Sequence, residues 1–353
     1  MSTIADVARK AGVSVSTISN VLNGRVDRMS SETLMRVEAA ITALDYRPNR
    51  AAQQLKTGQT PMFGLLVPSI ANPMYGMIAR EIETAAQERH GHRVMLGNTY
   101  RNKEKEGGFF DDLLAHGVRG VVVISSLVDE RHFEAAVQRG MVMVSYDRRA
   151  TPGAASAIDH VSVDNFEAAQ LAAQHLIAAG HTRIAFATAS GQTMSRSEKM
   201  RGFFAAAEAA GLRSHARVID GSTQSEYGDS EMADVGRLLA ARIAVQPERP
   251  TGLVAVNDML AFGLLAGFRD AGLVVPRDVS VIGMDGLYLS SLTSPGLTTV
   301  SLPVPEMART MVERLIARLA DPKVEPGEFL FKPSLVQRES VAGPLAILKK
   351  GMV

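Results

Sequence analysis

Between residues 63 and 283, short apolar runs rich in β-branched side chains alternate with segments of helical periodicity. Apolar strands separated by helices are typical of parallel sheets that helices cover on both faces. The alternation extends over about twice the length of one doubly wound sheet, so the sequence predicts an α/β fold with two lobes. The predicted strands are Phe63–Val67, Val94–Gly97, Gly120–Ser125, Val142–Tyr146, Ile184–Thr188, Gly252–Val256 and Val279–Gly283. The predicted helices include Tyr75–Glu88, Lys103–Ala115, Glu167–Ala178, Met200–Ala210 and Met259–Ala271.

The first 45 residues have a different pattern, which indicates three short helices. Gly12 is placed to end the first helix, Ser14 is a candidate N-cap of the second, and Ser31 precedes the third. The chain therefore begins with a small all-α domain. The apolar residues expected to face inward are Ile4, Val7, Ala8, Ala11, Val15, Ile18, Val21, Leu22, Leu34, Val37, Ile41 and Leu44.

The connection between the first two helices is the most specific signal in the chain. Gly12 permits a tight turn, and Val13 can fill the space beneath it. The second helix carries Ser16, Thr17 and Asn20 opposite its apolar stripe, and short polar side chains suit contact with base edges in the major groove. This pattern predicts a helix-turn-helix DNA reader. The alternative is an ordinary three-helix bundle with a polar outer face.

The charge is distributed unevenly along the chain. Residues 1–60 contain eight Lys or Arg and five Asp or Glu, a net charge of +3, whereas the rest of the chain carries −2. A basic small domain on a slightly acidic body is typical of a module that binds a phosphate backbone.

The composition excludes several classes of protein. The chain contains no cysteine, which excludes disulfides and thiolate chemistry. It has no apolar run near the ~20 residues that a membrane helix needs, and its start lacks the apolar stretch of a secretory signal. No phosphate loop, zinc-ligand cluster, nucleophile elbow or acid–base pair stands out. We therefore expect a cytoplasmic protein that is not an enzyme, with no catalytic residue, metal site, cofactor or membrane partner.

Several segments, in order and at matching spacing, resemble the lactose/galactose-repressor (LacI/GalR) family over roughly residues 3–342. The segments are Thr3–Ala8, Ala11–Asn23, Leu44–Ala52, Gly64–Pro73, Gly180–Phe186, Val256–Ala261, Pro276–Gly283 and Leu297–Val300. The resemblance implies a helix-turn-helix headpiece at 1–47 and a hinge helix with linker at 48–60. It also implies a periplasmic-binding-protein-like domain at 61–343, whose two doubly wound lobes are joined by three crossovers. Residues 344–353 are predicted to be a loose tail.

The function that the resemblance implies is sequence-specific transcription regulation, with repression as the expected mode. Operator affinity would be controlled by a small polar effector, a sugar or sugar acid. The other partners would be a near-palindromic double-stranded operator and a second copy of the chain, with a tetramer left open. The alternative is a periplasmic-type sugar-binding protein of the same two-lobed fold, which the basic headpiece and the lack of a signal peptide disfavour.

The resemblance implies that Val15, Ser16 and Asn20 point at bases, with Thr17 on the same polar face. Asn20 stands at a position that is often Arg in the family. Asn favours bidentate contact with adenine whereas Arg favours guanine, so the half-site is expected to differ from that of Arg-bearing members.

The segment from residue 48 to residue 56 resembles the family's hinge helix, which folds on DNA and lies in the minor groove. Leu55 matches the leucine wedged into the central base step, a device that kinks DNA. Ala52 is small enough for close approach, and Asn49 and Arg50 complete the predicted contacts, Arg50 with a phosphate. The alternative is a plain linker helix with a buried leucine.

Polar residues that follow predicted strands indicate a ligand crevice at the carboxyl ends of the sheets. By resemblance, Asp147, Asn257 and Asp285 match positions that bind sugar hydroxyls. Carboxylate and amide groups suit polyols because each can engage two adjacent hydroxyls. The alternative for such residues is a helix N-cap after a strand, and it applies above all to Asp258 and also to Asp285.

Met74 and Tyr75 match a stretch that packs against the ligand in the family.

Lys199 stands where the family has Arg, and a Lys ammonium is a point donor rather than a planar fork. A different effector, or Arg196 as a different anchor, is therefore left open. Met284 and Gly286 replace commoner larger residues and are expected to loosen the wall of the crevice.

Overall fold

The computed structural model of the chain describes residues 2–22, 25–26, 29–46, 61–125, 131–150, 156–191, 193–223 and 231–344. Contacts between Cα atoms divide the chain into two compact units, residues 1–60 and residues 61–353. The predicted hinge residues Asn49, Arg50, Ala52 and Leu55 lie outside the described residues, as does most of the predicted tail. The predicted domain limits at residues 47, 60 and 343 stay predictions.

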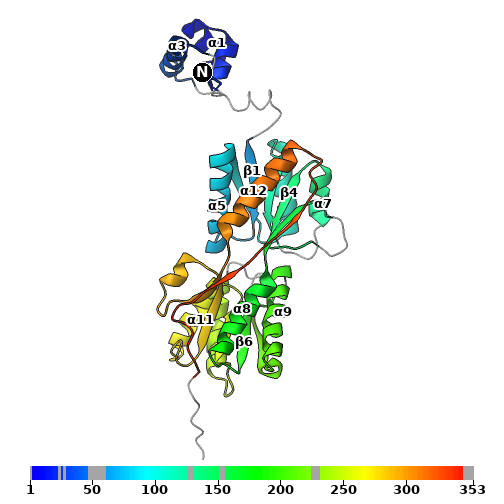
Figure 1. Ribbon diagram of the computed structural model, residues 1–353, viewed down its shortest axis with the longest axis vertical. Coiled ribbons are helices and arrows are strands. Elements are labelled where there is room, and N and C mark those ends of the chain that lie inside the picture. The colour runs from blue at the N-terminus through cyan, green and yellow to red at the C-terminus, as the bar shows by residue number, and fades with distance from the viewer. Residues whose placement is uncertain are drawn as a thin grey trace, which may run out of the picture. The chain divides into compact units, whose positions relative to one another are not determined.

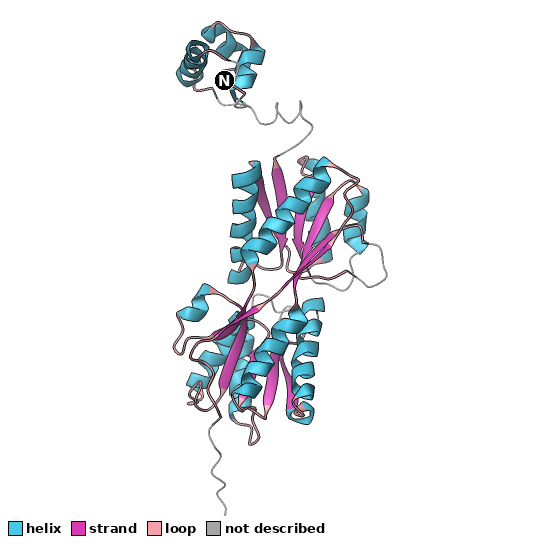
Figure 2. Ribbon diagram, viewed as in Figure 1, coloured by secondary structure: helices cyan, strands magenta, loops and turns pink. Residues whose placement is uncertain are grey.

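The first unit is built from helices, as Figure 2 shows. Gly12 ends the first helix in the left-handed conformation, with φ 66°, and Val13 packs against the core of the unit, as predicted. The Ser14 hydroxyl accepts a hydrogen bond from the Thr17 amide at 3.1 Å, which makes Ser14 the N-cap of the second helix. The cap of the third helix is Ser30, one residue before the predicted position. The helices are α1 (Ile4–Ala11), α2 (Val15–Leu22) and α3 (Ser31–Ala43).

The first lobe of the second unit contains a parallel sheet in the order β11-β5-β4-β3-β1-β2. Alternate side chains of its strands enter two separate apolar clusters, one shared with α5 and α12 and the other with α6 and α7. Figure 1 labels α5, α7 and α12 around this sheet. The strands are β1 (Met62–Val67), β2 (Arg93–Asn98), β3 (Gly120–Ile124), β4 (Val142–Tyr146), β5 (Asp159–Val163) and β11 (Glu328–Phe331). The helices are α5 (Pro73–His90), α6 (Lys103–Ala115), α7 (Arg131–Gln138) and α12 (Val304–Ala320).

The second lobe contains a sheet in the order β12-β10-β9-β8-β6-β7, in which only the edge strand β12 is antiparallel within the described residues. The strands are β6 (Ile184–Ala189), β7 (Ala216–Gly221), β8 (Gly252–Ala255), β9 (Ser280–Asp285), β10 (Thr298–Ser301) and β12 (Ser334–Val336). The helices are α8 (Asn165–Ala178), α9 (Met194–Ala209), α10 (Met232–Ala244) and α11 (Asp258–Asp270), with short 3-10 helices η1 (Arg213–His215) and η2 (Tyr288–Ser291).

Glycines allow the helices of the second lobe to pack in close pairs. A Cβ atom on Gly202 of α9 would lie 2.0 Å from the carbonyl oxygen of Phe166 in α8. A Cβ atom on Gly263 of α11 would lie 1.9 Å from the carbonyl oxygen of Ala233 in α10. Any side chain at these two positions would force the helices apart.

The chain passes between the two lobes three times, which confirms the predicted crossovers. It leaves the first lobe between β5 and α8, returns between β10 and α12, and leaves again between β11 and β12. Each of the seven predicted strands is present, and five further strands were not predicted: β5, β7, β10, β11 and β12. The α/β fold with two lobes is confirmed.

Candidate functional site

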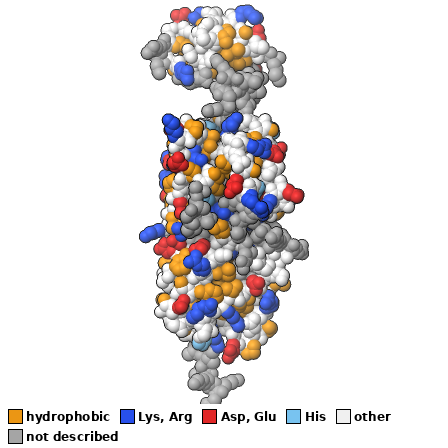
Figure 3. Space-filling model, turned by 90° about the vertical axis from the view of Figure 1, so that its right-hand side faces the viewer, with side chains coloured by type: hydrophobic (Ala, Val, Ile, Leu, Met, Phe, Trp, Pro, Cys, Tyr) orange, Lys and Arg blue, Asp and Glu red, His pale blue; other side chains and the backbone are white. Residues whose placement is uncertain are grey.

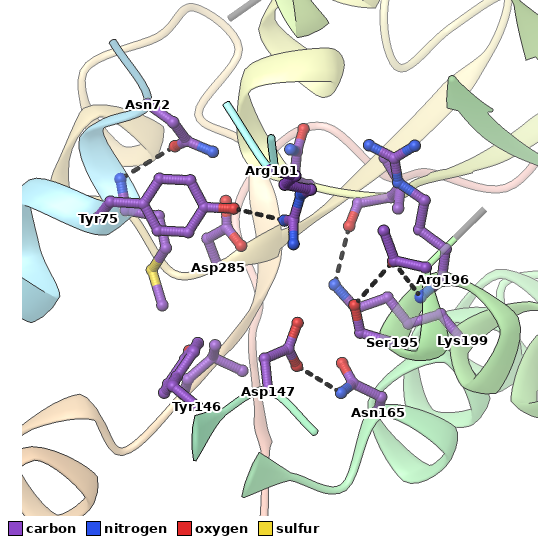
Figure 4. A pocket seen from close by; sticks show the side chains of 15 residues that line it. Asn72, Tyr75, Arg101, Tyr146, Asp147, Asn165, Ser195, Arg196, Lys199 and Asp285 are labelled. Carbon is purple, nitrogen blue, oxygen red and sulfur yellow. Dashed lines mark hydrogen bonds between the residues drawn. The ribbon is translucent and has the colours of Figure 1, made fainter. Parts of the chain in front are cut away.

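A cavity lies between the lobes, where the carboxyl ends of both sheets face each other. It encloses about 550 Å³ when the space open to solvent is included. The structure brings all the predicted effector residues to this one cavity (Figure 4). They are Met74, Tyr75, Asp147, Lys199, Asn257 and Asp285. Their role in binding stays a prediction.

Two lobes supply these side chains. From the first lobe, Tyr75 stands in the first turn of α5 and Asp147 follows β4 directly. From the second lobe, Lys199 stands on α9, Asn257 precedes α11, and Asp285 is the last residue of β9. A ligand that contacts both groups therefore bridges the lobes.

Asp285 is a buried carboxyl group in the wall of the cavity. It is 7% exposed, and its Oδ2 atom has no hydrogen-bond partner among the described residues. Burial raises the pKa of Asp285 well above its ordinary value, and the neighbouring Asp258 raises it further. Its backbone has φ 152°, a strained conformation for a residue other than glycine. Asp285 does not cap a helix, so the structure does not support the N-cap alternative for it.

Asp258 has a structural role. Its side chain is fully buried, and its Oδ2 atom accepts hydrogen bonds from the Leu287 amide at 2.9 Å and the Ser290 hydroxyl at 2.7 Å. Its Oδ1 atom accepts a third from the Thr299 hydroxyl at 2.5 Å. The helix cap is instead Asn257, whose Oδ1 atom accepts from the Leu260 amide at 2.9 Å. Capping uses one end of the Asn257 amide and fixes the side chain at the edge of the cavity.

Asp147 and Asn165 meet at the floor of the cavity. The Asn165 amide donates a hydrogen bond to Asp147 Oδ1 at 2.7 Å (Figure 4). Asp147 adopts a left-handed backbone conformation, with φ 62°, directly after β4. Tyr146 beside it is buried, and burial raises the pKa of its hydroxyl, with the charges of Asp147 and Asp285 adding to the effect.

Three cationic side chains line the same cavity. Arg101 follows β2 and donates from Nη2 to the Tyr75 hydroxyl at 3.2 Å. The Lys199 ammonium donates to the carbonyl oxygen of Val256 at 3.1 Å, and Arg196 donates to the carbonyl oxygen of Gly191. Both anchors left open by the sequence, Lys199 and Arg196, therefore reach the cavity. Asp147 and Asp285 are the two acidic residues that line the same cavity.

Sequence reasoning did not single out Arg101 or Asn165. Arg101 is 8% exposed and has φ 56°, and no apolar pattern marks such a turn. Asn165 begins α8 after β5, and β5 was not predicted. The usable signal for Asn165 was its position beside a polar N-cap, Asp164, whose carboxylate accepts from the Glu167 amide at 2.8 Å.

The expectation that Met284 and Gly286 loosen the cavity wall is wrong. Met284 is 1% exposed and belongs to the apolar core of the second lobe. Gly286 has φ 72°, and a Cβ atom there would lie 2.5 Å from the Ser301 hydroxyl. Neither residue lines the cavity, and both are closely packed on either side of Asp285.

In the first unit, α2 presents the predicted DNA-reading face. Val15 is 45% exposed, so the prediction that it faces inward is wrong. Ser16 and Asn20 are exposed, and Thr17 is half-buried. The hydroxyls of Ser16 and Thr17 lie 2.7 Å and 2.9 Å from the Ser14 hydroxyl, so the N-cap holds both side chains. Asn20 is one turn further along the helix. No acidic residue stands in the first turn of α2.

The residues described in the structure contain no group of three or more His, Cys, Asp or Glu side chains that would hold a metal ion. None of the described helices combines the length and the apolar character of a membrane span.

Two family models match the chain. The model of bacterial regulatory proteins of the lacI family matches residues 3–49, and the model of a periplasmic binding protein-like domain matches residues 173–341. The first match contains the whole of α1, α2 and α3, and the second contains most of the second lobe.

Curated relatives match along almost the whole chain. The HTH-type transcriptional regulator GalR of Escherichia coli (strain K12) is 30% identical over 347 residues, which cover 98% of this chain and 97% of that protein. The HTH-type transcriptional repressor PurR of Aliivibrio fischeri (strain ATCC 700601 / ES114) is 32% identical over 350 residues, which cover 98% and 100%.

Solved structures of transcriptional regulators are also similar to almost the whole chain. The lac repressor dimer bound to operator and the anti-inducer ONPF has a TM-score of 0.81 at 27% identity, covering 97% of this chain and 99% of that one. The complex of the transcriptional regulator CelR with cellobiose has a TM-score of 0.69 at 26% identity, covering 96% and 100%.

Proposed function

This chain belongs to the lacI family of bacterial regulatory proteins. We therefore propose that it is a repressor whose affinity for its operator is controlled by a small polar effector. Regulation of transcription through DNA binding is the function of the family. Repression, the nature of the effector and the residues that bind it are the finer parts of the proposal.

The observation that carries the proposal is the convergence of side chains from both lobes on one cavity. Asp147 and Tyr75 come from the first lobe, and Lys199 and Asp285 come from the second. A ligand held by both sets favours one arrangement of the lobes over others, and only such differential binding can shift a conformational equilibrium.

The lining of the cavity supports a sugar or a sugar acid as effector. Asp147 and Asn257 offer oxygen and nitrogen atoms that engage adjacent hydroxyls. Arg101 and Arg196 add cations that suit a carboxylate. The CelR structure holds cellobiose, which is a precedent for a sugar in this fold at 26% identity.

The headpiece supports specific reading of double-stranded DNA. We assign base contacts to Val15, Ser16, Thr17 and Asn20 because α2 exposes this face. One headpiece contacts too little DNA for tight specific binding, so we propose a homodimer on a near-palindromic operator. The lac repressor, similar over 97% of this chain, is a dimer on its operator. A repressor of this kind acts in the cytoplasm, where the bacterial chromosome is.

A gel-shift experiment tests the proposal as a whole. The full-length protein is mixed with genomic fragments, with and without a panel of neutral sugars and sugar acids. We expect a small set of fragments to be retained and one class of sugar to change their retention, in either direction. An Asn20→Ala variant is the control for specific binding. Equal retention of all fragments, unaffected by every sugar, would contradict the proposal.

A further inference from the structure

A second cavity lies in the second lobe, at the amino ends of β6, β8 and β9. The interlobe cavity is at the opposite, carboxyl ends of the same strands, so the two are separate. The second cavity encloses about 650 Å³ when the space open to solvent is included. Pro247 and Pro276 form part of its rim, and the fixed φ of proline limits the freedom of both loops.

The cavity is strongly basic. Three arginines line it, Arg183, Arg249 and Arg277, together with a single carboxylate, Asp278. Figure 3 shows one face of the second unit, on which basic and acidic side chains are interspersed. The lining of this cavity, in contrast, contains three guanidinium groups and one carboxylate.

Asp278 is fully engaged and does not neutralise the other arginines. Its Oδ2 atom accepts from Arg277 Nη2 at 2.9 Å and from the Val274 amide at 2.7 Å, and its Oδ1 atom accepts from Arg277 Nε at 3.2 Å. The Arg277 guanidinium is the first cause of the lowered pKa of Asp278, and Arg249 contributes to it. The Asp278 carboxylate thus pairs with Arg277, and the positive charges of the other two arginines are not compensated.

Arg183 and Arg249 are the two uncompensated cations. Within the described part of the chain, neither side chain forms a hydrogen bond or an ion pair. The Arg249 Nε atom is buried without a partner, and a buried donor left unpaired destabilises the protein unless a ligand or water satisfies it. Both side chains are half-buried, so their charges are less screened than those of fully exposed arginines.

His181 forms a neutral wall of the cavity. Its Nε2 atom lies 2.9 Å from the carbonyl oxygen of Ala342, which requires Nε2 to donate. Its Nδ1 atom lies 2.9 Å from the Thr251 hydroxyl, which then donates to it. Burial lowers the pKa of His181, which agrees with a neutral ring. The cationic character of the cavity therefore comes from the arginines.

We propose that this cavity binds a phosphate dianion, either inorganic phosphate or the phosphoryl group of a small metabolite. The planar guanidinium forks of Arg183 and Arg249 match phosphate oxygens, and a phosphate group carries about −1.5 to −2 at pH 7, equal to the two uncompensated charges. This second site is independent of the effector cavity, and the proposal does not depend on the identity of the effector.

Calorimetry on the full-length protein tests the proposal, with inorganic phosphate and glucose 6-phosphate as probes and glucose as the uncharged control. We expect the phosphates to bind and glucose not to bind at this site. Arg183→Gln and Arg249→Gln should each raise Kd about tenfold or more, because each removes charge-assisted hydrogen bonds. Tighter binding of inorganic phosphate would identify the free anion as the ligand, and tighter binding of glucose 6-phosphate would identify a phosphorylated metabolite.

Two control variants locate the bound phosphate. Arg269→Gln removes a 79% exposed arginine of the same lobe, which forms an ion pair with Asp270 at 3.6 Å, and should leave Kd unchanged. Arg196→Gln removes a cation of the interlobe cavity and should leave phosphate binding unchanged as well. Arg249→Lys keeps the charge without the fork and should give an intermediate Kd, so it serves if a Gln variant fails to fold. No binding of either phosphate, equal Kd in wild type and Arg249→Lys, or loss of binding in Arg196→Gln would overturn the proposal.

Discussion

Asn165 donates a hydrogen bond to Asp147 at 2.7 Å, and this bond joins the end of a first-lobe strand to the first residue of a second-lobe helix. The chain reaches Asn165 immediately after its first crossover, so the bond lies where the lobes would move relative to each other. The same carboxylate lines the effector cavity. A ligand that binds Asp147 therefore contacts the connection between the lobes.

The first prediction concerns this bond. Asn165→Ala should weaken effector binding about tenfold or more, because the Asp147 carboxylate loses the charge-assisted hydrogen bond that orients it. Calorimetry with a sugar selected from the panel gives Kd for the variant and the wild type. Gln174→Ala, an exposed change on the same helix, is the control. Identical Kd values for Asn165→Ala and wild type would show that the bond does not orient the site.

The second prediction concerns Asp285 and the switch. Asp285→Ala should abolish the influence of the effector on operator affinity while effector-free DNA binding stays close to wild type. Operator affinity is measured with and without the sugar, beside calorimetry for the sugar itself. Lys199→Ala should behave in the same way only if Lys199 has taken the role of the family's Arg. An Asp285 variant that responds like wild type would remove this residue from the proposed site.

The third prediction concerns the pH dependence of stability. The pKa of Asp285 is raised in the folded protein above its ordinary value of 3.8, so the folded state binds more protons than the unfolded state once the pH passes 3.8. The contribution of Asp285 to stability therefore falls as pH rises from there toward the folded pKa. Asp285→Asn lacks this loss, so its Tm relative to wild type should increase between pH 4.5 and pH 8.5. Parallel Tm curves for the two proteins would contradict the raised pKa.

The fourth prediction concerns base reading. Asn20→Ala should weaken binding to the cognate operator by about 1–3 kcal/mol and relax the preference at one base pair in each half-site. Selection from randomised operators measures both effects. Met35→Ala, a 63% exposed change on α3, is the control within the headpiece. Arg50→Ala should instead weaken binding to all sequences similarly and reduce the salt dependence. An unchanged base preference for Asn20→Ala would refute its role.

The fifth prediction rests on sequence alone, since Leu55 lies outside the described residues. If Leu55 wedges into the central base step, Leu55→Ala should reduce DNA bending and specific affinity together. The large domain should keep its stability. Energy transfer between dyes on the two ends of the operator measures the bend, and equal bending by variant and wild type would rule the wedge out.

Polar side chains are buried in two of the strands that the sequence did not predict, β5 and β10. In β5, Asp159 is fully buried, and it accepts hydrogen bonds from Arg314 at 2.8 Å and Arg318 at 3.1 Å. His160 of the same strand is held between two serine hydroxyls, of Ser145 at 2.8 Å and Ser156 at 2.9 Å. Arg314 and Arg318 follow Asp159 by 155 and 159 residues, so a local pattern could not show that this strand is buried.

The residues of the candidate site were also predicted only in part. The resemblance picked out six residues that the fold brings to one cavity. Three of them, Asp147, Asn257 and Asp285, stand at or just after the carboxyl ends of strands. The N-cap alternative holds for Asn257, which caps α11, and fails for Asp258, which accepts a hydrogen bond from the segment after β9. Neighbouring polar residues with the same local pattern thus take different roles, and only tertiary contacts distinguish them.

The three crossovers have a consequence for synthesis. The headpiece core is complete once residue 46 has left the ribosome, but the first lobe needs α12 and β11, which end at residues 320 and 331. At about 5–20 residues per second, the interval lasts roughly 15–60 s. Until then, the apolar face of the first sheet that Met307, Met311 and Leu315 later cover is open. A ribosome-bound chain that stops before residue 304 should therefore display a folded headpiece and a first sheet whose α12-contacting surface is still exposed, where molecular chaperones can bind.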